Sequence, residues 1–158
     1  MLNLFEAFLI LDQDGNRIVS KTYGKNLPDD LNVLIHKNLP GPKFIAEKYI
    51  MISETVADVN FYALCLNTSN EILMELALSV FIEALAIILL DKNICKRNCF
   101  LEYDKVLELV DEMIGFDGVV LEFDSETLAA RILTHRRTAK EETKGNVKLV
   151  AKSIWDNL

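Results

Sequence analysis

The chain has 158 residues, 51% of them hydrophobic and 26% charged, a composition typical of a folded domain. Its formal net charge of −7 leaves no basic excess to neutralise phosphates, which argues against nucleic-acid binding and against direct docking on an acidic membrane. Three cysteines are an odd, sparse set that fits a reducing compartment, so a cytosolic single-domain protein is expected.

The first part of the chain predicts a β-hairpin. Phe5–Leu11 is an apolar run typical of a strand buried on both faces, and Arg17–Tyr23 mixes β-branched, aromatic and polar residues as a half-exposed strand does. Between them, Asp14-Gly15 is a hairpin signal.

The same hairpin contains part of a calcium-loop pattern. Asp12, Asp14 and Asn16 occupy the first three ligand positions of an EF-hand loop. Arg17 and Tyr23, however, stand where that loop needs a glycine and a bidentate glutamate. The turn interpretation is therefore favoured over a calcium site.

The middle of the chain predicts a short helix and two further strands. Leu31, Leu34, Ile35 and Leu39 have helical spacing, and Pro40-Gly41-Pro42 ends the pattern. Lys43–Glu54 and Val56–Asn67 are rich in β-branched and aromatic residues, so they are expected to be strands joined tightly near Glu54-Thr55.

The most apolar stretch is Glu71–Leu90. Only Glu71, Glu75, Ser79 and Glu83 interrupt it, one every four residues, so on a helix they form a narrow polar stripe. Its length also suits a membrane span, but two glutamates inside it argue against insertion. We expect a soluble core helix that is covered on most sides by the sheet and the later helices.

The remainder predicts two more helices and a tail. Asp91–Asn98 is a polar break, Leu101–Ile114 has helical periodicity, and Gly115–Gly118 ends it. Val119–Glu122 is a short extended piece, and a last helix follows the Asp124 cap to about Leu133. Strands first and helices afterwards predict an α+β domain in β-β-α-β-β-β-α-α-α order, with a five-stranded, mainly antiparallel sheet covered by helices.

Catalytic signatures are missing from the sequence. It contains no GxxxxGK[ST], GxGxxG, HExxH or GxSxG motif, and the adjacent acids Asp111 and Glu112 would point about 100° apart on a helix. Cys95 and Cys99 could hold zinc only with Cys65, His36 or His135 completing four ligands. We therefore expect no enzymatic activity, catalytic residue, metal or cofactor.

A resemblance emerges near the end of the domain. LVDEMIGFDGVVLEFDSETLAARI (Leu109–Ile132) resembles the C-terminal part of the small chains of clathrin-adaptor and coatomer complexes. The stretches AFLILDQDGNRIVSKTY, DKNICKRN and GVVLEFD are most similar to the zeta branch of that family, from the COPI coat. Met51-Ile52 is followed by Ser53-Glu54 where the family pattern has tyrosine and a basic residue, and Val59-Asn60-Phe61 replaces Leu-Tyr-Phe.

The resemblance implies a longin-like fold for residues 1–134 and a structural role in a vesicle coat. It implies assembly with the large gamma-coatomer subunit and the rest of the coatomer, and an indirect link to an Arf GTPase and the Golgi membrane. The expected process is retrograde Golgi-to-ER and intra-Golgi transport by a cytoplasmic protein peripheral on the membrane. A sigma-type adaptor chain and another longin-type trafficking regulator remain alternatives.

Two segments are candidate partner interfaces. Apolar or aromatic residues beside the acidic pair suggest a cluster around the family motif, although Met113 and Ile114 also suit a core. Residues 135–158 read as a polar linker followed by an amphipathic helix, which either packs back on the domain or binds a partner through Trp155. The predicted interface residues are Tyr103, Asp111, Glu112, Met113, Ile114, Phe116 and Trp155.

Overall fold

The computed structural model describes residues 5–24, 27, 43–46, 48–90 and 92–134. Three predictions lie outside these residues: the short helix over Leu31–Leu39, the linker and tail from 135 to 158, and the placement of Trp155. The division of the chain into a domain and a tail therefore stays a prediction.

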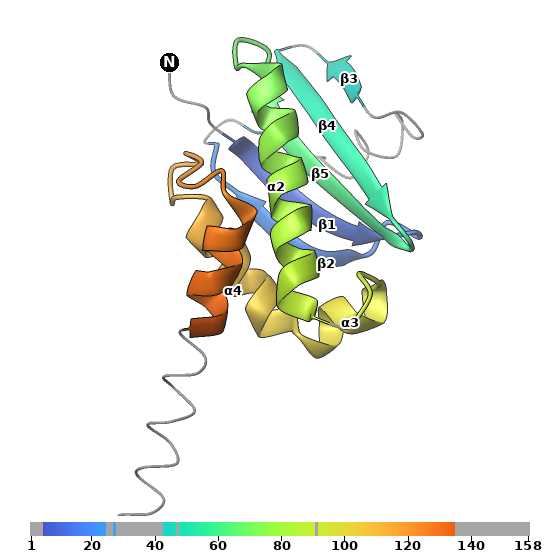
Figure 1. Ribbon diagram of the computed structural model, residues 1–158. Helices are drawn as coiled ribbons and strands as arrows, with labels where there is room; N and C mark the ends of the chain where they lie inside the picture. Colours follow the sequence, from blue (N-terminus) through green and yellow to red (C-terminus); the bar gives the residue numbers. More distant parts are fainter. Residues whose placement is uncertain (1–4, 25–26, 28–42, 47, 91, 135–158) are drawn as a thin grey trace, which may run out of the picture.

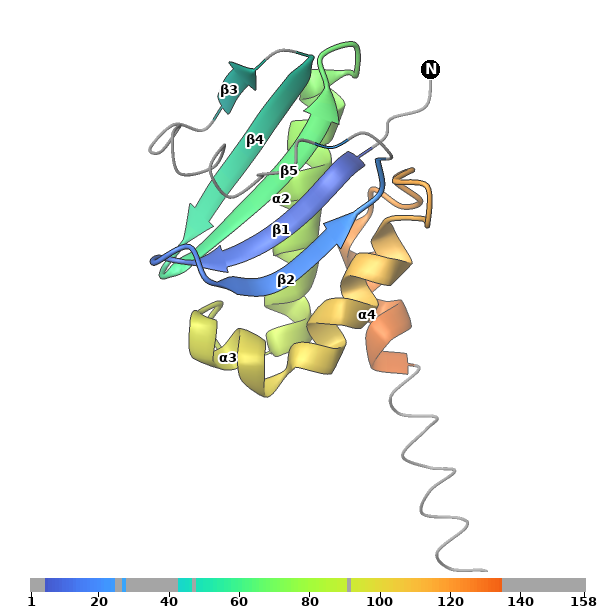
Figure 2. The ribbon, with the colours of Figure 1, turned by 180° about the vertical axis from the view of Figure 1, so that it is seen from behind.

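The core of the architecture is an antiparallel sheet in the order β2-β1-β5-β4-β3 (Figures 1 and 2). Four strands have six to eight residues and the fifth, at one edge, has only four. All four neighbouring pairs run antiparallel, which confirms the predicted sheet type. The strands are β1 (Phe5–Asp12), β2 (Arg17–Thr22), β3 (Lys43–Ala46), β4 (Tyr49–Val56) and β5 (Val59–Leu66).

Five strands were expected, but not these five. The predicted strand Lys43–Glu54 is a hairpin in which Ala46 pairs with Tyr49, so it supplies both β3 and β4. The turn between β4 and β5 lies at residues 57–58, where Ala57 has a φ of 52°, rather than near Glu54-Thr55. The extended piece over residues 119–122 forms no strand within the part of the chain that the structure describes; Val120 makes an isolated bridge with Ile114.

Within the described ranges four helices follow the sheet, where three were predicted. They are α2 (Glu71–Leu89), α3 (Lys96–Leu101), α4 (Tyr103–Met113) and a helix over residues 125–134. The unpredicted α3 falls partly in the expected polar break. Its first N–H group, from Lys96, donates a 2.8 Å hydrogen bond to the Asp58 carboxylate, a cap from the β4–β5 turn that no local pattern reveals.

The main core lies between the sheet and the helices. Phe8 and Phe81 pack edge to face with ring centroids 4.7 Å apart, and Phe61 lies 6.1 Å from Phe81. On the other face of the sheet a second buried cluster includes Leu9 and Tyr62. Because successive residues of β1 point to opposite faces and both sets are buried, the prediction of a strand buried on both faces is confirmed.

Helix α2 packs against the sheet with one face only. Nine of its residues are buried, Phe81 and Leu85 fully, and it contacts β4, β5 and α4. By length and composition it could cross a membrane, yet 56% of its most apolar window is buried inside this domain. The later helices were expected to close over α2, and for its outer face this expectation is wrong. The sheet lies behind α2 and α4 lies beside it, so neither covers the outer face (Figure 1).

Candidate partner interface

The predicted interface residues centre on the last turn of α4 and the loop after it. Asp111 and Phe116 are exposed there, and Glu112 is about one-third exposed. We call Asp111, Glu112 and Phe116 the α4-end surface. Tyr103 starts the same helix, about 12 Å along its axis from Asp111, so the structure does not bring it into this cluster.

Met113 and Ile114 are not part of any exposed surface. Met113 is fully buried and Ile114 is 2% exposed, and both belong to the main core. Their placement as interface residues is therefore wrong, and the alternative that they serve the core is confirmed. The physical reason is the helical period: Met113 follows Val106, Leu109 and Val110 on the buried face of α4.

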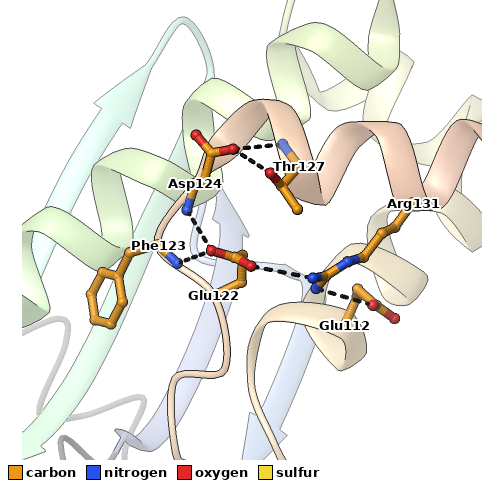
Figure 3. A network of polar contacts seen from close by, with 6 residues as sticks. All are labelled: Glu112, Glu122, Phe123, Asp124, Thr127 and Arg131. Atoms are coloured by element: carbon orange, nitrogen blue, oxygen red, sulfur yellow. Dashed lines mark hydrogen bonds and ion pairs between the residues drawn. The ribbon is translucent and has the colours of Figure 1, made fainter.

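Glu112 belongs to a network that joins two helices (Figure 3). The Arg131 guanidinium lies 3.6 Å from a Glu112 carboxylate oxygen and 3.2 Å from one of Glu122. The other Glu122 oxygen accepts hydrogen bonds from the backbone N–H groups of Phe123 and Asp124. Arg131 thus ties the end of α4 to the loop and helix that follow, which gives Glu112 a role inside the chain.

Asp124 extends this network to the start of the last helix. Its carboxylate accepts hydrogen bonds from the Thr127 backbone N–H at 3.1 Å and from the Thr127 hydroxyl, and these bonds lower the pKa of Asp124. This geometry confirms the predicted Asp124 cap. Arg131 and Glu122 were missed from the sequence, because the pairs they form depend on how two helices pack and not on local spacing.

Asp111 faces the sheet. Its carboxylate lies 3.1 Å from the Lys21 ammonium of β2, and both side chains are substantially exposed. Beneath them, burial raises the pKa of Tyr23 to about 12, with the Asp111 charge as a second cause. Exposed ion pairs of this kind contribute little to stability, so Asp111 is available for exchange of partners.

Phe116 is the most exposed large apolar side chain of the described residues, at 96%. The loop that carries it is held firmly: Gly115 donates to the Val119 carbonyl, and Gly118 donates back to the Gly115 carbonyl. The Gly118 carbonyl in turn accepts a 2.7 Å hydrogen bond from Phe5, the first residue of β1. An aromatic ring on a braced loop is a typical interface anchor, because little entropy is lost when it binds.

The structure also places the residues that were considered as metal ligands. The Asp12 carboxylate accepts N–H groups from Asp14 and Asn16 at 2.9 and 2.8 Å, as a strand-linking turn requires, so the turn interpretation is confirmed. Across the described ranges, no three or more His, Cys, Asp or Glu residues come together as metal ligands. His36 and His135 lie outside those ranges.

Comparisons with known proteins agree with the sequence resemblance. A model of the family described as clathrin adaptor complex small chain matches residues 4–139. The coatomer zeta subunit of Saccharomyces cerevisiae is 30% identical over 145 residues, covering 80% of this chain and 76% of that protein. Coatomer zeta-2 of Arabidopsis thaliana and zeta-1 of Homo sapiens are each 25% identical, covering 82% and 80% of this chain and 78% and 75% of theirs.

Structure comparison shows the same fold at lower identity. A chain of a homology model of the full-length AP-3 complex, in a stretched open conformation, superimposes with a TM-score of 0.62 at 14% identity. The match covers 90% of this chain and 99% of the other. With a family match over most of its length, this chain belongs to the clathrin adaptor complex small chain family, whose members are non-enzymatic coat subunits.

Proposed function

We propose that the chain is a zeta-type small subunit of the COPI vesicle coat. In this role it assembles with the large gamma subunit of coatomer and acts in retrograde Golgi-to-ER and intra-Golgi transport. It works in the cytoplasm and reaches Golgi and vesicle membranes through the coat, with Arf as an indirect partner. It needs no cofactor for this.

One observation carries the proposal: the alignment with yeast coatomer zeta extends over most of both chains at 30% identity. The family model also spans residues 4–139, so the similarity takes in the strands, the helices and the loop of the α4-end surface and is not confined to one motif. The sheet followed by helices is consistent with the longin-like fold that the family resemblance implies.

The α4-end surface is the part of the predicted interface that we propose meets the large subunit. Phe116 supplies an exposed apolar anchor and Asp111 an exposed charge, the combination found where an interface core meets its rim. Glu112 is assigned to holding the surface in shape, because its ion pair with Arg131 is internal.

Affinity purification of the tagged full chain from its own cells, followed by mass spectrometry, tests the proposal. Recovery of gamma-coatomer and the other coatomer subunits supports it. Recovery of a clathrin-adaptor set would assign the chain to the sigma branch, and recovery of a lone regulatory partner would favour a trafficking regulator. An untagged strain processed in parallel provides the background.

A further inference from the structure

Helix α3 turns a small apolar and basic face towards solvent. Phe100 and Leu101 are 49% and 59% exposed. They lie three and four residues after Arg97, which is also exposed, so the three side chains share one face of the helix. Cys99, on the other face, is fully buried. We call Arg97, Phe100 and Leu101 the α3 surface.

The α3 surface lies at the end of the molecule where the last helix stops. Figures 1 and 2 place α3 at the same end as the last turn of the helix over residues 125–134, away from the sheet. The segment 135–158 therefore begins at this end of the molecule.

This segment differs in charge from the remainder of the chain. Residues 135–158 contain six lysine or arginine residues and three acids, a net charge of +3, which leaves −10 on residues 1–134. Lysine recurs in the segment at every fourth residue, at positions 140, 144, 148 and 152. The charge of the whole chain argues against docking on an acidic membrane, but this segment has the opposite sign and is attracted to one.

The same segment has an apolar side. Four aliphatic residues are spaced for one face of a helix: Val147, Val150, Ile154 and Leu158. On such a helix Trp155 would lie at the edge of this face, between the aliphatic side chains and Lys148 and Lys152. Basic amphipathic helices of this type bind in the plane of a membrane surface, with tryptophan at the level of the lipid headgroups.

We propose that the α3 surface and residues 135–158 together bind an anionic lipid bilayer. Residues 147–158 would lie in the headgroup region as a helix, with Trp155 and the aliphatic side chains turned towards the acyl chains. Phe100 and Leu101 would touch the same leaflet, with Arg97 beside a lipid phosphate. The proposal goes beyond the proposed function, in which the chain reaches membranes through the coat.

A bilayer matches both the charge and the apolar character of this surface. The row of lysines meets headgroup phosphates, and the aliphatic face with its tryptophan meets the boundary to the acyl chains. Lys96 already pairs with the Asp12 carboxylate at 2.8 Å, so Arg97 is the cation that α3 adds. The net charge of −10 over residues 1–134 repels an anionic membrane from the other faces, which orients the molecule.

Trp155 makes the contact measurable, because it is the one tryptophan of the chain. The full chain is mixed with vesicles of phosphatidylcholine and phosphatidylserine, and in parallel with vesicles of phosphatidylcholine alone. The fluorescence emission should shift to shorter wavelength with the anionic vesicles and stay unchanged with the neutral ones. Co-sedimentation gives the affinity for the anionic vesicles, which should fall as salt is added.

Two pairs of variants test the two parts of the surface. Lys152→Glu should bind anionic vesicles at least about tenfold more weakly, and Leu101→Gln several-fold more weakly. Lys48→Glu is the control for charge, because Lys48 is exposed and precedes β4, whose start lies at the far end of the molecule from α3 (Figure 1). Leu121→Gln is the control for apolar contact, because Leu121 is 60% exposed and precedes the other end of the last helix. All four variants should keep the thermal stability of the wild type.

The outcomes separate this proposal from the proposed function. Failure of the full chain to bind anionic vesicles overturns it and leaves the coat assignment in place, because the assay contains no coat partner. Equal binding to neutral vesicles, or wild-type binding by both Lys152→Glu and Trp155→Ser, also overturns it. An equal emission shift with inorganic phosphate would assign the cations to a free anion, and a shift that requires the large coat subunit would assign the segment to a protein; either result overturns the lipid contact.

Discussion

Asp12 at the end of β1 and Lys96 at the start of α3 form an ion pair of 2.8 Å across 84 positions of sequence. The Asp12 side chain is only 3% exposed, and it also accepts hydrogen bonds from the backbone of Asp14 and Asn16. A single carboxylate therefore shapes the first turn and anchors the short helix that the sequence did not predict.

Replacing this carboxylate should loosen both elements. The neutral amide of Asp12→Asn cannot form the ion pair with Lys96. Its NH2 group also donates hydrogen bonds where the native carboxylate oxygen accepts them. We expect a lower melting temperature by several degrees, measured by circular dichroism. Asp14→Asn is the control, because Asp14 is an acid in the same turn whose side chain is exposed. It should change the melting temperature little. Equal stability of wild type and Asp12→Asn would show that the ion pair contributes nothing.

The same residue predicts a pH dependence. The hydrogen bond with Lys96 is the largest cause that lowers the pKa of Asp12, from 3.8 to about 2. As the pH falls, the unfolded chain takes up this proton first, so the contribution of Asp12 is complete above about pH 4 and is lost between about pH 4 and 2. The difference in free energy of unfolding between wild type and Asp12→Asn should shrink over that range, as urea titrations at several pH values would reveal. A difference in free energy of unfolding that stays constant over this pH range would contradict the prediction.

Gly118 should not tolerate a side chain. It has a φ of +86°, and a Cβ atom there would lie 2.1 Å from the Phe5 carbonyl oxygen. Gly118→Ala therefore combines backbone strain of about 1–3 kcal/mol with a collision against β1, and unfolding by urea should show at least that loss. Gly115→Ala is the matched control, because the atom nearest to its Cβ would be an Asp117 side-chain oxygen at 3.2 Å. An equal loss in both variants would refute the special role of Gly118.

The three cysteines should differ in reactivity. Burial raises the pKa of Cys65 to about 12 and that of Cys99 to about 11, with nearby negative charges as further causes. Cys95 is partly exposed. Because the thiolate is the reactive form, iodoacetamide at pH 8 should label Cys95 alone in the native chain and all three in guanidinium chloride, as mass spectrometry would resolve. Rapid native labelling of Cys65 would contradict the burial of β5.

Local patterns predicted the elements whose stability is local. The hairpin turn at Asp14-Gly15, the long apolar helix and the Asp124 cap each depend on residues within a few positions of one another, and all three are observed. The misses have long-range causes. Helix α3 depends on Asp58, which is 38 positions away, and Val120 in the piece over 119–122 pairs with Ile114 at the end of α4.

The candidate interface shows the same limit. Its motif directed the prediction to the end of α4, but an amphipathic pattern does not say which apolar residues a neighbouring helix will bury, and Met113 and Ile114 lie in the core. The exposure of Ile72 and Leu76 on α2 was missed for the opposite reason. A nearly all-apolar helix looks fully buried in sequence, and only packing shows which of its faces stays open.

The α4-end surface yields the last prediction. Phe116→Ser removes a ring that is 96% exposed, so it should change the free energy of unfolding by less than about 0.5 kcal/mol. If the ring is an anchor, the same change should weaken binding to the large coat subunit about tenfold. Asp111→Lys should also weaken binding, and it exchanges an exposed pair with Lys21 for a repulsion.

Glu112→Lys is the contrasting variant. It places a cation beside Arg131, which already pairs with Glu122, so it should lower stability as well as binding. Calorimetry and pull-down of Phe116→Ser, Asp111→Lys and Glu112→Lys distinguish a residue that contacts the partner from one that only holds the surface in shape. Loss of binding at constant stability indicates a direct contact, and loss of both binding and stability indicates a structural role. Unchanged binding in Phe116→Ser and Asp111→Lys would remove the α4-end surface as a contact, and the large subunit would then have to meet the chain on another face.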